Sequence, residues 1–258
     1  MNAADSILSA AFRQRLGGQT ALLCDGKALS YEQVRDAVGR SAQALRGLGL
    51  PPGGRVLLLL RDSPALVGAY LGAIAAGGVA VTISLRVTTA ELETAVSDSQ
   101  CEIVLIDAAL FPVFAPALGG GRRPPRIYSV HGPVAGFPSW EECCARARPE
   151  FICEDMAPDA AAFWIYTSGT TGELKGCVHR HEAVLPASDY LRETLGLRPG
   201  MRLHATSKLF FAYALGTCLF GAFQLGHIHG PAVIFKFRVR HRFEFLDETS
   251  RKIVHAIQ

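Results

Sequence analysis

The sequence predicts an α/β fold in which helices flank mostly parallel sheets. Short apolar runs without alternation, such as residues 55–60 and 103–106, are typical of strands covered on both faces. Segments of helical period separate these runs, and strands that alternate with helices indicate a parallel sheet. The chain has 258 residues, of which 49% are hydrophobic, so it holds enough material for a large core.

Turn and capping signals place the first elements. We expect a helix and a loop over 1–20, and then a hairpin that begins with the strand 20–24 and turns at an Asp-Gly pair. Ser30 and Gln33 form a capping box, which starts a helix with one apolar face. This helix is predicted to end near Gly47–Gly49.

One uncharged segment, residues 63–85, is long enough to cross a membrane. However, Pro64 directly after Ser63 is typical of a helix start. The pair Gly77-Gly78 then breaks the helix before the strand-like run 79–83. We therefore expect a buried helix, a turn and a strand rather than a membrane span.

The alternation continues with a helix from Thr88, where Glu91 completes a second capping box, and with the strand 103–106. The Pro/Gly-rich stretch 112–138 is predicted to be a long surface connection that contains a short strand at 127–130. Further along the chain, the patterns predict a strand at 176–178, a helix at 181–195 and a strand at 201–205.

Residues 166–176 read Tyr-Thr-Ser-Gly-Thr-Thr-Gly-Glu-Leu-Lys-Gly and follow the apolar run 160–165, which predicts a buried strand. Glycines let the backbone approach a ligand, so that successive N–H groups converge on an anion, and a lysine supplies a compact positive charge. The candidate phosphate-binding residues are Thr167, Ser168, Gly169, Thr170, Thr171, Gly172 and Lys175. Ligands of parallel sheets sit at the carboxyl ends of strands, where this loop is expected to lie.

The spacing excludes a P-loop NTPase. A Walker loop requires Gly, four residues and then Gly-Lys-Ser/Thr. Leu174 stands where a glycine should precede the lysine, and Gly176 stands where a hydroxyl residue should follow it.

The loop resembles the signature of the adenylate-forming enzymes, which include acyl-CoA synthetases, luciferases and peptide-synthetase adenylation domains. Their pattern is Tyr-Thr-Ser-Gly-Thr-Thr-Gly-x-Pro-Lys-Gly, and this chain departs from it at Leu174 in place of proline. A flexible surface turn is the alternative interpretation, which a match of this length after a buried strand disfavours. The resemblance implies ATP, Mg²⁺ and CoA as cofactors, and Lys175 as a catalytic residue.

A second informative stretch, residues 207–216, is rich in aromatic side chains that can simply belong to the core. It is similar to Lys-Leu-Phe-Phe-Ala-Tyr-Gly-Leu-Gly in benzoate-type aryl-CoA ligases. This resemblance implies that Ala212 and Tyr213 contact the ring of the acid substrate, with Lys208 and Phe211 nearby. The expected partner is therefore a small aromatic carboxylate.

The resemblance extends to about residue 226, and the tail 227–258 differs from the family. Basic and aromatic residues alternate over 235–243, which fits a strand with one basic face, a nucleic-acid or anionic-surface contact, or sequence never selected for structure. We favour a truncated or frameshifted reading frame. Residues 1–226 are then the N-terminal portion of the large domain of an AMP-forming ligase, and the fold is an incomplete N-terminal domain.

Composition narrows the remaining function classes. The net charge of +3 is too small to indicate nucleic-acid binding. Seven cysteines form no CxxC pair, and with no export signal they predict reduced thiols in a cytoplasmic protein. His179 and His181 have only Cys177 at ligand spacing, so we expect a local structural or capping role and no metal site.

Two hypotheses remain. In the first, the chain is part of an AMP-forming aryl-acid:CoA ligase, in which the carboxylate and ATP give acyl-AMP and CoA then forms the thioester. In the second, it is a non-catalytic fragment with a remnant phosphate-binding loop; an adenylating domain that serves a carrier protein is not distinguished from the first. Family members carry further catalytic residues downstream, so we expect little turnover from this chain alone.

Overall fold

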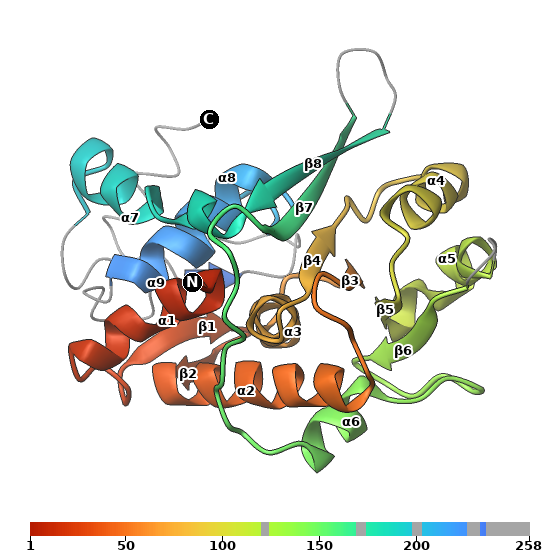
Figure 1. Cartoon of the computed structure of the whole chain (residues 1–258), viewed down its shortest axis with the longest axis horizontal. Coiled ribbons are helices and arrows are strands. Elements are labelled where there is room, and N and C mark those ends of the chain that lie inside the picture. Colours follow the sequence, from red (N-terminus) through yellow and green to blue (C-terminus); the bar gives the residue numbers. More distant parts are fainter. Residues whose placement is uncertain (120–123, 169–173, 198–202, 226–232, 236–258) are drawn as a thin grey trace.

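The computed structural model describes residues 1–119, 124–168, 174–197, 203–225 and 233–235, and every structural statement below concerns these residues (Figure 1). They form a six-stranded sheet in the order β6-β5-β3-β4-β7-β8, with helices on both faces. All its pairs are parallel except that of β7 with β8. The predicted fold class, layered α/β with a mostly parallel sheet, is confirmed.

The strands of this sheet are β3 (Arg55–Leu59), β4 (Val79–Thr82), β5 (Ile103–Asp107), β6 (Arg126–Val130), β7 (Ala161–Ser168) and β8 (Leu174–Arg180). Every residue of β4 and β5 is buried, as expected for strands covered on both faces. A smaller sheet joins β2 (Lys27–Ser30), β1 (Thr20–Cys24) and β9 (Val233–Phe235). The predicted hairpin is confirmed as the antiparallel pair of β1 with β2.

Helices α2 (Tyr31–Gly47), α3 (Pro64–Ala75) and α4 (Thr89–Ser99) begin where the sequence predicts, and α1 (Ala3–Arg13) lies within the expected helix and loop over 1–20. The sequence did not predict α5 (Phe111–Leu118) or α6 (Trp140–Arg146). Both capping boxes are present, because Ser30 and Gln33 exchange hydrogen bonds and so do Thr88 and Glu91. Capping boxes satisfy N–H groups that a helix itself leaves unpaired, so these local signals are strong.

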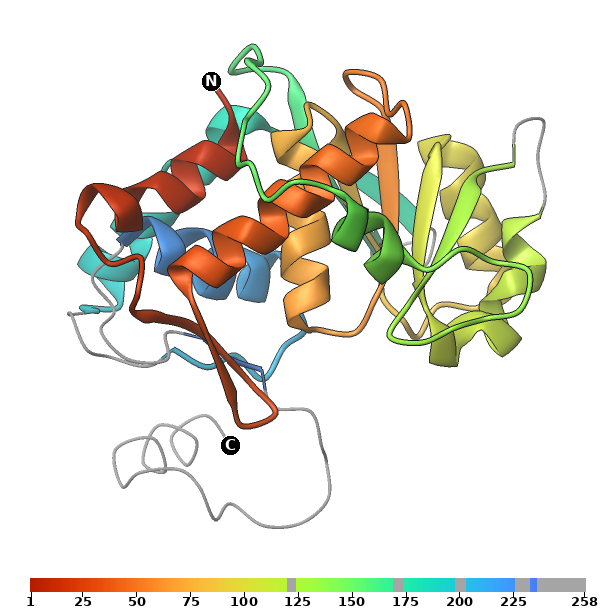
Figure 2. The ribbon, with the colours of Figure 1, turned by 90° about the horizontal axis from the view of Figure 1, so that it is seen from below.

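The uncharged segment is a buried layer of the protein rather than a membrane span. Helix α3 is buried from Leu66 to Ala75, between the sheet and α2, which lies over it (Figure 2). A turn at Gly77 leads into β4, so the predicted helix, turn and strand are confirmed. Of the described helices, none has the length and apolar character needed to cross a bilayer.

The stretch 112–138 is more ordered than its composition suggests. Its predicted strand is confirmed as β6, but the expectation of a long surface connection is wrong, because α5 occupies 111–118. Pro112 stands in the first turn, where a missing N–H costs nothing. The buried side chains of Phe111 and Phe114 hold this short helix against the sheet despite Pro116 within it.

The predicted helix over 181–195 is also wrong in part. The segment divides into a 3₁₀ turn η2 (His181–Val184), α7 (Ala187–Asp189) and a π-helical turn η3 (Tyr190–Thr194). Pro186 separates the first two, since it lacks the N–H that a continuous helix requires. Of the predicted strand 201–205, the first two residues lie outside the described ranges and 203–205 form no strand.

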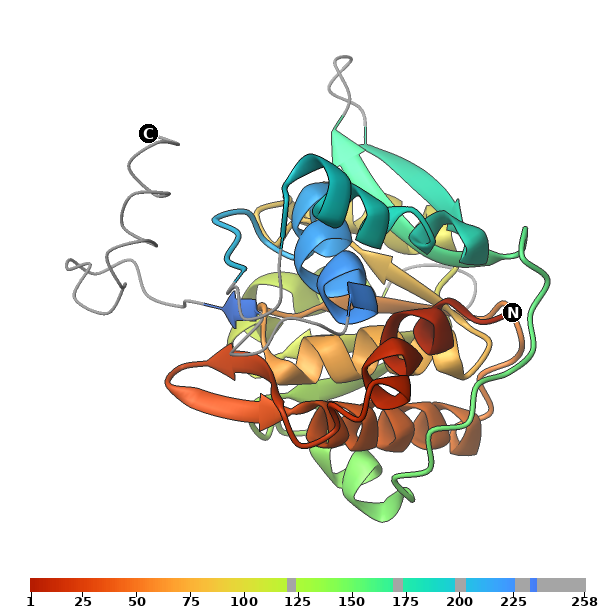
Figure 3. The same ribbon diagram turned by 90° about the vertical axis from the view of Figure 1, so that its left-hand side faces the viewer.

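The final described helical region covers the same face of the sheet as α1 and α3. It consists of α8 (Ala212–Ala214), the π-helical segment η4 (Leu215–Gly221) and α9 (Ala222–Leu225). Helix α9 packs against α1 (Figure 3). The buried rings of Tyr31 and Phe223 meet edge to face at 5.4 Å, which joins α9 to α2.

A buried carboxylate ties together three strand ends at the carboxyl edge of the sheet. Asp107, the last residue of β5, accepts hydrogen bonds from Arg61 Nε at 2.6 Å and Nη2 at 3.2 Å, and its Oδ2 lies 3.1 Å from His131 Nδ1. Arg61 follows β3, and His131 follows β6. Burial by itself would raise the pKa of Asp107, but the hydrogen bonds from His131, Arg61 and the Ala109 N–H hold it at about 2.

The stabilising contacts of the Asp107 carboxylate with Arg61 and His131 are expected to be lost in acid. The folded pKa of Asp107 lies below the ordinary value, so its stabilisation is complete above about pH 4 and is lost as the pH falls toward 2. We compare the free energy of unfolding of the wild type with that of Asp107→Asn. The advantage of the wild type is expected to be about 2 kcal/mol larger at pH 6 than at pH 2. Urea denaturation of both proteins across this range measures the difference. A difference that does not change with pH would contradict the assignment.

Candidate functional site

The predicted phosphate-binding loop joins β7 to β8, and its two ends are described. Thr167 pairs with Lys175, and Ser168 pairs with Leu174. The side chains of Thr167 and Lys175 are both exposed. The candidate residues Gly169, Thr170, Thr171 and Gly172 lie outside the described residues, so their roles stay predictions.

The base of the loop is fixed to the opposite face of the sheet. Side chains alternate between the two faces of a strand, so Tyr166 points away from Thr167. The Tyr166 hydroxyl donates a hydrogen bond to Asp98 Oδ2 at 2.6 Å. Burial, and then the neighbouring Asp98, raise the pKa of Tyr166, so the phenol stays protonated. A Cβ at Gly176 would lie 3.2 Å from this ring, which explains the small residue after Lys175.

A pocket of about 360 Å³ lies beside the same strands, between the β7–β8 pair and the helical segments α7 to η4. This volume falls within the range of small-molecule sites, about 300–1,000 Å³. Phe163, Ile165 and Phe220 are nearly fully buried and form its apolar inner wall. Tyr190 and Tyr213 are 43% and 60% exposed and form its rim.

An aromatic cluster closes the pocket on its inner side. The ring of Phe163 lies 4.6 Å from that of His179, stacked at 6°, and 5.2 Å from that of Phe220 in an edge-to-face contact. Behind it, Tyr70 of α3 contacts both phenylalanines at 6.2 and 6.1 Å. The stack of Phe163 with His179 follows from the strand register, since these residues are cross-strand partners.

The four candidate substrate-binding residues divide into two pairs. Ala212 and Tyr213 line the pocket. Phe211 lies outside the lining, is 48% exposed and packs on Phe210 at 4.7 Å. Lys208 also lies outside it, with its Nζ 3.8 Å from Asp62 Oδ2. The part of each residue in binding stays a prediction.

The Lys208 contact has a structural reason. The side chain of Asp62 is 7% exposed, and burial raises its pKa. The hydrogen bond from the Leu209 N–H at 3.0 Å and the charge of Lys208 act in the opposite direction and lower that pKa. The carboxylate thus fixes the segment that leads to α8 against the start of α3. Sequence reasoning did not identify this contact, because Asp62 and Lys208 lie far apart in the chain.

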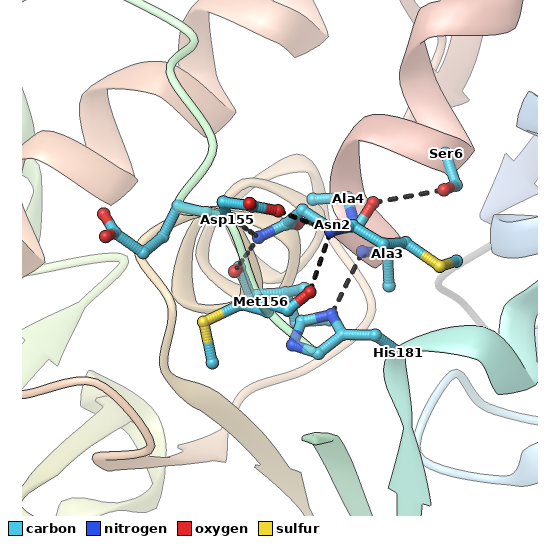
Figure 4. Close-up of polar contacts among 10 residues, drawn as sticks. Asn2, Ala3, Ala4, Ser6, Asp155, Met156 and His181 are labelled. Atoms are coloured by element: carbon cyan, nitrogen blue, oxygen red, sulfur yellow. Dashed lines mark hydrogen bonds and ion pairs between the residues drawn. The ribbon is translucent and has the colours of Figure 1, made fainter. Parts of the chain in front are cut away.

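His181 takes the capping role that the sequence predicts for it. It is fully buried, and its Nδ1 accepts the N–H of Ala3 at 3.1 Å, at the first turn of α1 (Figure 4). Asn2 caps the same helix through the N–H of Ala4 and donates to Ile74 O and Glu154 O. Burial, and then the N-terminal charge of Met1, lower the pKa of His181, which keeps the imidazole neutral as this acceptor role requires.

Metal ligands and thiols are the remaining candidates for chemistry. Within the described ranges, no group of three His, Cys, Asp or Glu side chains is placed to hold a metal ion. All seven cysteines are free thiols.

Comparison with known proteins places the chain in a family. Residues 9–253 match the model of the AMP-binding enzyme family. A 3-hydroxybenzoate–CoA/4-hydroxybenzoate–CoA ligase of Thauera aromatica is 38% identical over 229 residues, which cover 88% of this chain and 44% of that enzyme. The chain thus spans about half the length of the curated relatives it matches.

Two solved structures have the same arrangement. The anthranilate CoA ligase AuaEII in complex with anthranoyl-AMP superimposes with a TM-score of 0.84 at 26% identity, over 91% of this chain and 45% of that one. A benzoate CoA ligase from Burkholderia xenovorans LB400 gives 0.79 at 28% identity, with the same coverage. The chain therefore belongs to the AMP-binding enzyme family and corresponds to the N-terminal part of an adenylate-forming enzyme.

Proposed function

We propose that this chain supplies the acid pocket and the phosphate-binding lysine of an AMP-forming aryl-acid:CoA ligase. The observation that carries the proposal is that pocket and lysine share one face of one β-ribbon. Side chains of a strand alternate, so Lys175, Cys177 and His179 lie on the same face of β8. Their partners on that face of β7 are Thr167, Ile165 and Phe163.

The spacing suits an aromatic acid beside a nucleotide. Lys175 and His179 are four residues apart on β8, which places their Cα atoms about 13 Å apart. A ring held against Phe163 and Phe220 then directs its carboxylate along the ribbon toward the loop. The lining is mostly apolar, as a benzene ring requires, and the relatives above are named as ligases of hydroxybenzoate, benzoate and anthranilate.

The proposed reaction has two steps. A carboxylate oxygen attacks the α-phosphorus of ATP, the bond to pyrophosphate breaks, and acyl-AMP forms. The thiolate sulfur of CoA then attacks the acyl carbon, and AMP leaves. Lys175 would neutralise charge on the phosphates and on the departing pyrophosphate, which lowers the barrier of the first step. We expect Mg²⁺ to neutralise charge on the phosphates in such chemistry, and we assign none of the described residues to its site.

The cellular setting forms part of the proposal. Free thiols persist in reducing compartments, so we place the protein in the cytoplasm. Its proposed partners are a small aromatic carboxylate, ATP and CoA.

Lys175→Ala is expected to weaken ATP binding by the purified chain at least tenfold. A charge-assisted hydrogen bond contributes about 1.5–3 kcal/mol, and each 1.4 kcal/mol corresponds to a factor of ten. Titration calorimetry measures the affinity. Lys27→Ala is the matched control, because Lys27 is an exposed lysine on β2 of the other sheet. Equal affinities in the wild type and Lys175→Ala would remove Lys175 from the site.

The function itself is tested by pyrophosphate release from the chain with ATP, Mg²⁺ and a panel of benzoates. Release that depends on an aromatic acid and falls in Lys175→Ala supports adenylation by this chain. If the chain is inactive alone, binding of the same acids by ligand-observed NMR tests the pocket. Failure to bind both ATP and every aromatic acid would overturn the proposal.

A further inference from the structure

We infer that His179 is a specificity-determining residue, which hydrogen-bonds a hydroxyl or amino group at the 3- or 4-position of the bound aromatic acid. The inference rests on the proposed function of the pocket as the acid site. It goes further by assigning the feature of the pocket that distinguishes a substituted ring from plain benzoate.

The first step is the scarcity of polar groups in the pocket. Its inner wall is apolar, and the Thr217 hydroxyl is already engaged, because it donates to the Tyr213 carbonyl at 2.7 Å. The two lining tyrosines, Tyr190 and Tyr213, are 43% and 60% exposed and so belong to the rim rather than to the inner wall. The imidazole of His179 is thus the polar group that a deeply placed ring substituent meets.

The second step is the unused hydrogen-bonding capacity of this imidazole. Within the described part of the chain, neither ring nitrogen of His179 has a hydrogen-bond partner, and neither is completely enclosed by protein. His181 differs, since its Nδ1 accepts the N–H of Ala3 and its Nε2, which has no partner among the described residues, is completely buried. His179 and His181 therefore have different roles, although they are only two residues apart in the sequence.

The third step is orientation. Parallel stacking on Phe163 fixes the plane of the His179 ring, so its nitrogens lie at the edge rather than against the phenyl face. Burial lowers the pKa of His179, so the imidazole is neutral near pH 7 and offers one donor and one acceptor. A phenol or an aniline can match either, whereas a plain ring leaves both unpaired.

The fourth step is the position of the substituent on the ring. With the carboxylate directed toward Lys175, the side of the ring remote from the carboxylate faces His179, about 13 Å along the strand from the lysine. Substituents at the 3- and 4-positions lie on that side. A 2-substituent lies next to the carboxylate and points toward the loop.

The test measures dissociation constants of the full chain for benzoate and for 2-, 3- and 4-hydroxybenzoate by ligand-observed NMR titration. His179→Leu is expected to weaken binding of the 3- or the 4-hydroxy acid about five- to tenfold, on the scale of one hydrogen bond. Binding of benzoate and 2-hydroxybenzoate is expected to change less than about twofold on the same scale. His179→Gln, which retains a donor and an acceptor, is expected to recover part of the loss.

Benzoate serves as the internal control for folding, since it needs the pocket but not the imidazole edge. An equal loss for benzoate and the hydroxybenzoates would make His179 a packing residue and overturn the inference, while the proposed acid site would stand. Unchanged binding of every acid in His179→Leu would overturn it as well. Wild-type chain that binds no aromatic acid would overturn both the inference and the assignment of the pocket.

Discussion

Phe163→Ala is expected to lower the free energy of unfolding by about 3–5 kcal/mol, the cost of truncating a large aromatic side chain in a core. Phe163 is 3% exposed, and its ring contacts those of Tyr70, His179 and Phe220. These partners come from α3, β8 and η4, so no single movement closes the cavity that alanine leaves. Urea denaturation followed by tryptophan fluorescence measures the loss.

Phe211→Ala is the matched control for this stability measurement. Phe211 is 48% exposed and contacts the ring of Phe210, so its truncation removes little buried area. Its effect on stability is expected to stay below about 1 kcal/mol. Similar losses in the two variants would show that the aromatic cluster is not a centre of stability.

Gly72→Ala is expected to destabilise the protein by about 2–3 kcal/mol, although alanine is ordinarily the better helix former. Helix α3 crosses α2 at this point, and a Cβ at Gly72 would lie 2.4 Å from Ser41 Cβ and 3.1 Å from the Ala42 nitrogen. Relief requires the two helices to separate, which opens the core they share. The shift of the thermal midpoint measures the effect.

Gly47→Ala is the matched control for Gly72→Ala, because the same change of glycine to alanine is not expected to destabilise the protein there. No atom lies within 4 Å of a Cβ built at Gly47, the exposed last residue of α2, so this variant should be neutral or slightly more stable. Adding Ser41→Gly to Gly72→Ala removes the nearest clash and should restore part of the loss. Equal effects of the two alanine substitutions would rule out helix contact as the cause.

Local signals explain why much of the architecture is predictable. The caps at Ser30, Ser63 and Thr88 use hydrogen bonds that span three residues, so the sequence alone places the helix starts. The errors have local causes too. Prolines and glycines suggested a surface connection over 112–138, but packing of buried phenylalanines holds a helix at 111–118. A single proline divides the expected helix 181–195.

The candidate site was predictable to the extent that it is contiguous. The phosphate-binding pattern lies within eleven residues, so Thr167 and Lys175 are identifiable from their sequence neighbours, and so are the aromatic residues around Tyr213. The pocket between these stretches was not predictable. Phe163 and His179 stack only because β7 and β8 pair in one particular antiparallel register.

The sequence by itself therefore determined the α/β class and the starts of α2, α3 and α4, and it predicted a phosphate-binding loop, since each depends on neighbours along the chain. Only the tertiary structure decided which residues share the pocket, and that Lys208 pairs with Asp62 instead of lining it. It also decided that Arg61, Asp107 and His131 meet at one edge of the sheet. Such contacts join residues that are remote in the chain, and the packing of the whole sheet and its helices selects them.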